Sequence, residues 1–172
     1  MKAPLVCTQR KNTAVHPVTR RSLFSSLEPL EQRIAPAVFM VSNTNDSGAG
    51  SFRQAILNAN TTENQGAADE IRFFIEGFGT LKIQPLTPLP IITDPVIIDG
   101  YSQAGALPNS LEIGSNAVLR IELDGSLTGD GVNDHGLNIQ AGGSTVKGLI
   151  INRFSSYGIA MVNGDGNTIA GN

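Results

Sequence analysis

Apolar and polar residues alternate with a period of two along most of the chain after residue 70. The alternation runs through residues 71–76, 81–84 and 119–124, and a short apolar run covers 96–98. Each run has three to six residues and ends near Gly, Pro, Asn or Asp, which is typical of short β-strands separated by turns. Four prolines between residues 85 and 95 interrupt the pattern, so we expect an irregular edge or loop there.

One earlier segment has a helical period instead. Ser51 can cap a helix, and a Gln three residues later gives the spacing of a capping box. Four apolar residues then share one helical face, residues 60–62 end the segment, and Arg53 and Asn58 face away from the apolar side. So short a helix is unstable alone in water and has to dock its apolar face. We therefore predict a short structural cap formed by Ser51, Phe52, Gln54, Ala55, Ile56 and Ala59.

The last third of the chain repeats itself. Residues 136–139 match residues 158–161 at an offset of 22, and residues 145–148 match residues 168–171 at an offset of 23. A constant period with several short strands predicts a solenoid, in which each turn of the chain stacks on the previous one about 4.8 Å away. A β-sandwich remains an alternative, because it explains the number of strands, but it does not explain the shared offset.

Composition divides the chain near Pro36. Residues 1–36 hold six Lys or Arg, two acids and no Gly, whereas residues 37–172 hold six Lys or Arg, thirteen acids and all nineteen glycines. We predict a basic, disordered leader or sorting segment in residues 1–36 and a folded body in residues 37–172. The leader lacks the apolar run of a secretory signal, and no stretch reaches the roughly 20 apolar residues of a membrane span.

Charge and cysteine content narrow the chemistry. A net charge of −3 does not favour nucleic acid as a partner. The single cysteine, Cys7, lies in the leader, so the body has no disulfide. With two His and one Cys, a zinc site of the His/Cys type is not available.

The best candidates for a catalytic pair of carboxylates are Asp99, Asp124, Asp130 and Asp134. Asp99 and Asp124 each stand between an apolar run and a Gly, and glycoside hydrolysis generally needs two carboxylates at a fixed separation. They would form such a pair if they stacked on successive coils. We favour the alternative, in which each carboxylate binds the backbone of its own turn. Arg153 and His135 are conceivable bases, but solvated or hydrogen-bonded roles are favoured, and we predict no catalytic residue in this segment.

A loop rich in oxygen ligands is the one candidate metal site. Asp130, Asn133 and Asp134 lie close together in the sequence, and carboxylate and amide oxygens are ligands that Ca²⁺ prefers. The loop lacks the spacing and the terminal Glu of an EF-hand, so ordinary turn chemistry is the alternative. We predict no other cofactor.

Several motifs together resemble a known family. They are VSNTNDSGAGSFRQAI at 41–56, DEIRFFI at 69–75, LPIITDPVIIDGYSQAG at 89–105, and then GLNI, VKGLIINRF and NTIAGN. They are similar to the N-terminal region of secreted bacterial right-handed parallel β-helix proteins of the pectate-lyase-like type, which commonly open with a Ser-Leu-Arg-Glu-Ala-Ile helix. Here Ser-Phe-Arg-Gln-Ala-Ile stands at 51–56, with Gly50 where the family often has Cys. The resemblance implies a right-handed parallel β-helix, or solenoid, with a short N-terminal capping α-helix.

The end of the leader carries a second resemblance. The stretch SLFSSLEPLEQRIAPA at 22–37 resembles the N-terminal segment of large surface or exported proteins of planctomycete-type bacteria. Together the two resemblances imply an exported, extracellular or cell-surface location.

The functional expectation is a structural or adhesive β-helix module without catalysis in this segment. The alternative is the N-terminal part of a polysaccharide lyase or glycoside hydrolase whose active site lies on later coils. Because residues 168–172 stand in mid-repeat, we expect the partner to be further coils of the same protein or a stacking partner at the C-terminal end. Surface polysaccharide is a further possible partner, whereas nucleic acid and a transmembrane segment are not expected.

Overall fold

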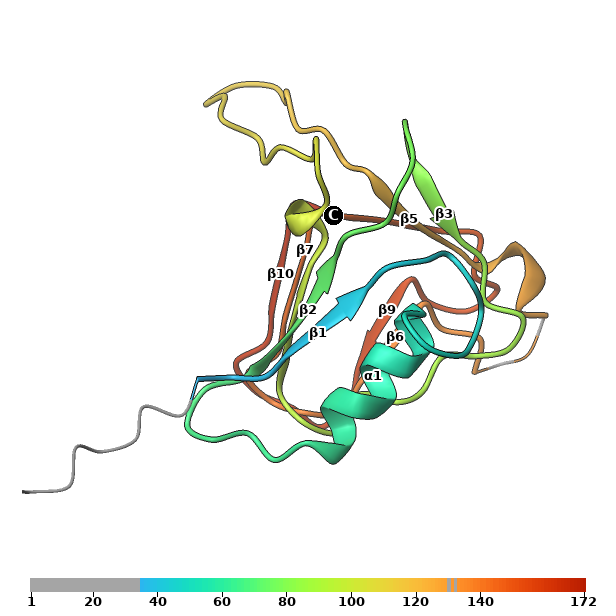
Figure 1. Ribbon diagram of the computed structural model, residues 1–172, viewed down its shortest axis with the longest axis vertical. Helices are drawn as coiled ribbons and strands as arrows, with labels where there is room; N and C mark the ends of the chain where they lie inside the picture. The colour runs from blue at the N-terminus through green and yellow to red at the C-terminus, as the bar shows by residue number, and fades with distance from the viewer. Residues whose placement is uncertain (1–34, 130, 132) are drawn as a thin grey trace, which may run out of the picture. The chain divides into compact units, whose positions relative to one another are not determined.

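The computed structural model describes residues 35–172 except 130 and 132, and Figure 1 shows their arrangement. The predicted disorder of the leader falls on residues outside the described part of the chain, apart from Ala35 and Pro36. Among the described residues the chain is rich in strands, with ten β-strands and one α-helix. The predicted mostly-β class, with one short helix near the start, is confirmed.

The strands form three parallel sheets. The first sheet has the order β1 (Val38–Val41), β2 (Asp69–Phe73), β4 (Val96–Asp99), β7 (Thr145–Lys147) and β10 (Thr168–Ala170). The second has the order β3 (Leu81–Ile83), β5 (Ile121–Asp124) and β8 (Leu149–Asn152). The third pairs β6 (Leu137–Ile139) with β9 (Ile159–Met161), and Ile92 adds an isolated parallel bridge to Ile139.

From β2 onward the chain visits the three sheets in rotation. It passes from β2 to β3 and the Ile92 bridge, then through β4, β5 and β6, then through β7, β8 and β9, and ends in β10. The predicted repeat is confirmed by the register, because Leu137 pairs with Ile159 and Thr145 pairs with Thr168. These pairs have the offsets of 22 and 23 found in the sequence. Parallel pairing in all three sheets does not fit a β-sandwich, whose sheets are antiparallel.

The inward side chains stack in rows along the sheets. In the first sheet one row consists of Phe39, Ile71, Ile98, Val146 and Ile169, each paired with the next. The three middle members are fully buried, whereas Ile169 at the end of the row is 38% exposed. Side chains from all three sheets belong to one continuous hydrophobic core. The alternation seen in the sequence therefore marks which side chains enter a shared interior.

The helix α1 (Phe52–Thr61) supplies its apolar face to the same core. Phe52, Ala55, Ile56 and Ala59 are all buried, and the Phe52 ring lies 5.6 Å from the ring of Phe73. Figure 1 shows α1 in front of the strands, beside β1 and β2, and the helix contacts both strands. The predicted docking of the apolar face is thus observed.

The predicted capping box is only half formed. The Oγ of Ser51 accepts a hydrogen bond from the backbone N–H of Gln54 at 3.2 Å. The side chain of Gln54 does not return to Ser51 but donates to Oδ1 of Asn58 at 2.9 Å, one turn along the helix. The reason is that the backbone N–H of Ser51 already donates to the carbonyl of Gly48 at 3.1 Å.

One strand was not predicted and several strand boundaries differ from the sequence pattern; β2, for example, spans Asp69–Phe73 where alternation runs through 71–76. β1 was not predicted, because its residues Val-Phe-Met-Val are all apolar and show no alternation. The strand expected from residue 119 begins at Ile121, after the chain has returned from a long excursion in which Leu107 and Val118 form an antiparallel bridge. The described part of the chain contains no helix with the length and apolarity needed to cross a membrane.

Candidate functional site

The side chain of Asn60 closes a strand edge at the end of α1. Its Nδ2 donates to the carbonyl oxygen of Ile91 at 2.7 Å, and its Oδ1 accepts from the backbone N–H of Thr93 at 2.9 Å. A neighbouring strand would offer the same donor and acceptor. The amide therefore occupies the edge beside Ile92, the residue that begins the third sheet by its bridge to Ile139.

Arg53 binds backbone carbonyl groups of the segment just before this edge. Its guanidinium donates to the carbonyl oxygens of Thr87 and Pro88, both at 2.8 Å, and pairs with Asp46 Oδ1 at 2.7 Å. The same Asp46 oxygen accepts from the backbone N–H of Leu86 at 3.0 Å. Since Arg53 and Asn60 are seven residues apart on α1, one side of the helix reaches backbone groups between 87 and 93.

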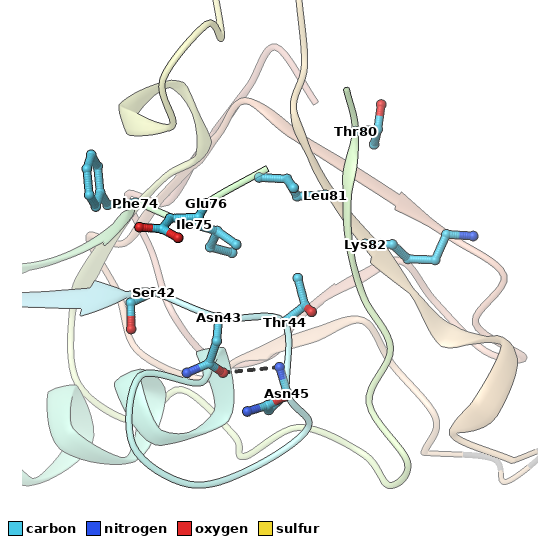
Figure 2. A pocket seen from close by; sticks show the side chains of 10 residues that line it. All are labelled: Ser42, Asn43, Thr44, Asn45, Phe74, Ile75, Glu76, Thr80, Leu81 and Lys82. Atoms are coloured by element: carbon cyan, nitrogen blue, oxygen red, sulfur yellow. Dashed lines mark hydrogen bonds between the residues drawn. The ribbon is translucent and has the colours of Figure 1, made fainter. Parts of the chain in front are cut away.

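The edge of β3 is not covered in this way. β3 pairs with β5 on one side and with no strand on the other, among the described residues. A cavity of about 620 Å³ opens beside this edge, lined by residues 42–45, 74–76 and 80–82 (Figure 2). Figure 2 shows Phe74 and Glu76 on one side of the cavity and Leu81 on β3. The cavity is an open hollow with mixed apolar and polar walls rather than an enclosed catalytic pocket.

A charged cluster covers the outer face of the second sheet. Asp124 is 1% exposed, and its two oxygens contact Arg153 Nε at 2.6 Å and Lys82 Nζ at 3.2 Å. Glu122 Oε1 accepts from Arg153 Nη2 at 2.7 Å. Each of the three strands β3, β5 and β8, or the residue that follows it, supplies at least one member. The cluster therefore ties the three neighbouring strands together across the sheet.

These groups are poorly suited to proton transfer. The hydrogen bond from Arg153 holds the pKa of Asp124 far below its usual range, against the opposing effect of burial, and bonds from Ser126 and Lys82 act in the same direction. The hydrogen bond to Asp124 raises the pKa of Arg153 further above its usual value. A general acid or base needs a pKa near the working pH. Both groups instead keep fixed charges.

The two acids weighed as a catalytic pair do not come together. Asp99 ends β4 in the first sheet, and Asp124 ends β5 in the second, so the expectation that they might stack on successive coils is wrong. Each binds its own turn: Asp99 Oδ1 accepts from Tyr101 N–H and Asp124 Oδ1 from Ser126 N–H, both at 3.0 Å. The favoured alternative, a carboxylate that caps its own turn, is confirmed for both.

The candidate calcium loop is described only in part, because Asp130 lies outside the described residues. Asn133 is exposed. Asp134 is buried, and its Oδ2 accepts from the backbone N–H of Ser155 at 3.1 Å and from its hydroxyl at 3.0 Å. In residues 35–172 without 130 and 132, no three His, Cys, Asp or Glu side chains are grouped to hold a metal ion. Asp134 thus bonds a segment 21 residues further along the chain, and calcium binding by this loop stays a prediction.

His135, a conceivable base in the sequence, packs against an aromatic ring. Its ring centre lies 5.5 Å from that of Tyr157. Burial alone would raise the pKa of Asp134, but hydrogen bonds from Thr128 and Ser155 and the charge of His135 outweigh it, so the pKa is lowered. Asp134 thus bonds Ser155 and His135 packs on Tyr157, while Oδ1 of Asp134 and Nδ1 of His135 have no hydrogen-bond partner among the described residues.

The polar contacts of α1 could not be predicted from the sequence pattern. Arg53 and Asn60 were not placed in the predicted cap, because their partners lie 31 to 35 residues away in the irregular segment between the prolines. Arg53 and Asn60 are spaced by two helical turns, and this spacing is the one sequence signal that they share a second, polar side of the helix. In comparisons with known proteins, no family model, no curated protein and no solved structure matches the chain.

Proposed function

We propose that residues 37–172 form the N-terminal cap and first coils of an exported right-handed parallel β-helix, which serves as a structural or adhesive cell-surface module. The rotation of the chain through three parallel sheets, with a period of 22 to 23 residues, supports the coil. A right-handed sense follows from the general rule that nearly all parallel crossover connections are right-handed. The resemblance of residues 22–37 to leaders of exported bacterial proteins supports the location.

The observation that carries the proposal is the difference between the two ends of the stack. At the α1 end the interior is closed by buried apolar side chains and by the contacts of Arg53 and Asn60. At the other end the interior rows reach the surface, where Met161 is 53% exposed and Ile169 is 38% exposed. Exposed apolar rows on unpaired strands are surfaces that pair or aggregate unless something covers them.

This difference gives the module its role. α1 acts as a lid for one end, and the β9 and β10 end is the surface on which further coils of the same protein or a stacking partner pack. The charged cluster around Asp124 then serves as a brace between coils, because its fixed charges hold three strands together and do not transfer protons. Surface polysaccharide would be a ligand of the assembled stack.

Self-association tests the open end. We expect the full chain to associate as its concentration rises, measured by sedimentation velocity, and the double variant Met161→Lys, Ile169→Lys to remain monomeric. The control is Leu127→Lys together with Leu111→Lys, two exposed apolar residues outside β9 and β10, which should leave association unchanged. Equal association of all three proteins would contradict the proposed role of this end.

A cleavage assay distinguishes a structural module from a polysaccharide-cleaving enzyme. The purified chain is incubated with neutral and acidic polysaccharides, and release of reducing ends or of unsaturated products is followed. We expect none from this segment. Turnover that disappears in the Asp124→Asn variant would contradict a structural role for the charged cluster and would favour the alternative, a polysaccharide lyase or glycoside hydrolase.

A further inference from the structure

A buried carboxylate stands at the point where the described body begins. Asp69, the first residue of β2, is 2% exposed, and its Oδ1 accepts a hydrogen bond from the backbone N–H of Ala37 at 2.8 Å. Its other oxygen, Oδ2, is closed to solvent and has no hydrogen-bond partner among the described residues. A buried carboxylate with one oxygen left without a partner is costly, so a positive group beside this carboxylate would be stabilising.

Two more acids surround the same place without a cation. Glu63 and Asp69 line a cavity of about 220 Å³ together with residues 35–37. Burial raises the pKa of Asp94, and the charges of Asp69 and Glu63 raise it further. In the described part of the chain, no Lys or Arg forms an ion pair with any of these three acids.

The geometry favours a cation that belongs to the chain over a free ion. No group of three acidic or His side chains among the described residues is arranged to hold a metal. A hydrated ion does not reach Oδ2 of Asp69, because that oxygen has no contact with solvent. The backbone nitrogen of Ala37, in contrast, already lies 2.8 Å from Oδ1. If that nitrogen were an α-ammonium group, it would bring a full positive charge to the carboxylate without any rearrangement of the strands.

We propose that the chain is processed by hydrolysis of the peptide bond between Pro36 and Ala37, and that the resulting α-ammonium group of Ala37 forms an ion pair with Asp69. The co-reactants are water and an endopeptidase acting in trans on the unfolded precursor. The C–N bond breaks, the hydroxyl of water goes to the carbonyl carbon of Pro36, and its proton goes to the nitrogen of Ala37. Near neutral pH that amine takes up a second proton and becomes the ammonium group.

The hydrogen bonds of Ala37 favour cleavage of the peptide bond between Pro36 and Ala37 over cleavage of neighbouring peptide bonds. A cut one residue later would remove Ala37, and both Asp69 Oδ1 and the N–H of Glu70, which donates to the Ala37 carbonyl at 2.8 Å, would lose their partner. A cut before Ala35 would leave the ammonium group two residues away from the carboxylate. Of the three positions, cleavage after Pro36 alone keeps β1 in place and brings the charge to Asp69.

The test uses the full chain with a built-in cut. Residues 33–36 are replaced by a recognition sequence for a site-specific endopeptidase that cuts after its last residue, so that cleavage leaves Ala37 first. In the matched control the recognition sequence replaces residues 31–34 and leaves Ala35 first. The thermal midpoint is measured before and after each cut, and the pKa of the new α-amino group is measured by NMR.

The expected result is a midpoint raised by about 2–4 °C after the cut at Ala37 and not after the control cut. The α-amino pKa of Ala37 should lie at least about one unit above its ordinary value of about 7.7–8.0. The variant Asp69→Asn should lose both effects. If Asp69→Asn does not fold, the comparison of the Ala37 and Ala35 termini decides the matter.

Three outcomes of these measurements would overturn the proposal. The first is an ordinary α-amino pKa at Ala37, and the second is an equal midpoint gain after the control cut. The third is a rise in the midpoint of the uncut chain on addition of Ca²⁺ or Mn²⁺ that Asp69→Asn abolishes, which would assign the site to a free ion. Mass spectrometry of the protein isolated from its native cells gives an independent check. The proposal predicts Ala37 as the first residue, and Val38 as the first residue would contradict cleavage after Pro36.

Discussion

At the scale of single residues, Arg153 has the most constrained backbone in the charged cluster. Its φ of 60° lies in the left-handed region, which residues other than glycine seldom adopt. The conformation follows directly after β8 and turns the guanidinium onto Asp124 and Glu122. Strain of this kind persists where surrounding contacts determine it. The two ion pairs supply those contacts, so the strained turn and the buried acid stabilise each other.

Asp124 should therefore make stability depend on pH. Its pKa in the folded state is far below the value of about 3.9 in an unfolded chain. Its contribution is therefore fully present above about pH 5, begins to fall near pH 4, and is lost progressively as the pH drops toward the much lower folded-state pKa. We expect Asp124→Asn to lower the free energy of unfolding by about 1.5–3 kcal/mol at pH 7. The difference from the parent should shrink below about pH 4, as measured by urea unfolding across the pH range.

The exposed Asp165 provides the control for this measurement. Asp165→Asn should leave both the stability at pH 7 and its pH dependence close to those of the parent. A gap between parent and Asp124→Asn that stays constant from pH 7 to pH 3 would show that the carboxylate acts through its shape rather than its charge.

At the scale of elements, α1 has two working faces. The apolar face fills the end of the core, and the side that carries Arg53 and Asn60 satisfies backbone groups between 87 and 93. The apolar face was predictable, because a period of 3.6 is visible within ten residues of sequence. The polar contacts were not, because they depend on where the chain returns after about thirty residues.

The apolar face is tested by a charge at its centre. Ile56 is 1% exposed, so Ile56→Asp places an unpaired carboxylate inside the core, and we expect the protein to aggregate. The control is Leu57→Asp, at a neighbouring position that is 41% exposed, which should stay soluble. The readout is the soluble fraction after expression together with light scattering. A soluble and unchanged Ile56→Asp protein would refute the role of α1 as a lid.

The polar side is tested at Asn60. Asn60→Ala removes both hydrogen bonds to the edge at Ile91 and Thr93, and water can replace them in part because both residues are exposed. We expect a loss of about 1 kcal/mol in the free energy of unfolding and faster hydrogen exchange at the N–H of Thr93. Asn58→Ala, which removes an exposed contact within the helix, should change neither. Equal effects of the two substitutions would leave the edge contact without a role.

Glycines fix how closely the coils approach. A Cβ added to Gly136 would overlap the carbonyl oxygen of Gly158 in the next coil, whereas a Cβ added to Gly131 meets open space. Gly136→Ala should therefore push two coils apart and cost about 1–3 kcal/mol, measured by chemical denaturation. Gly131→Ala, whose φ is not in the left-handed region, should be nearly neutral. If the two variants have the same free energy of unfolding, close packing against Gly158 does not explain the glycine at position 136.

At the scale of the whole molecule, the sequence predicted the repeat better than the site. The offsets of 22 and 23 equal the observed register, because successive coils place the same kind of residue at the same position. The charged cluster could not be predicted in the same way, because Lys82, Asp124 and Arg153 meet only once β3, β5 and β8 have paired in one sheet. β1 was missed because four consecutive apolar residues carry no period that distinguishes a strand.

The coil itself is the central claim, and disulfide formation tests it most directly. In a Cys7→Ser background, cysteines replace Asn138 and Ala160, which pair across β6 and β9. Paired residues on neighbouring strands lie about 4.8 Å apart, within the reach of a disulfide, whereas Asn138 and Val162 are two residues out of register and beyond about 7 Å. We predict rapid oxidation of the 138/160 pair to an internal disulfide and a reduced 138/162 control. A reduced 138/160 pair, or equal oxidation of both, would contradict the stacked coil.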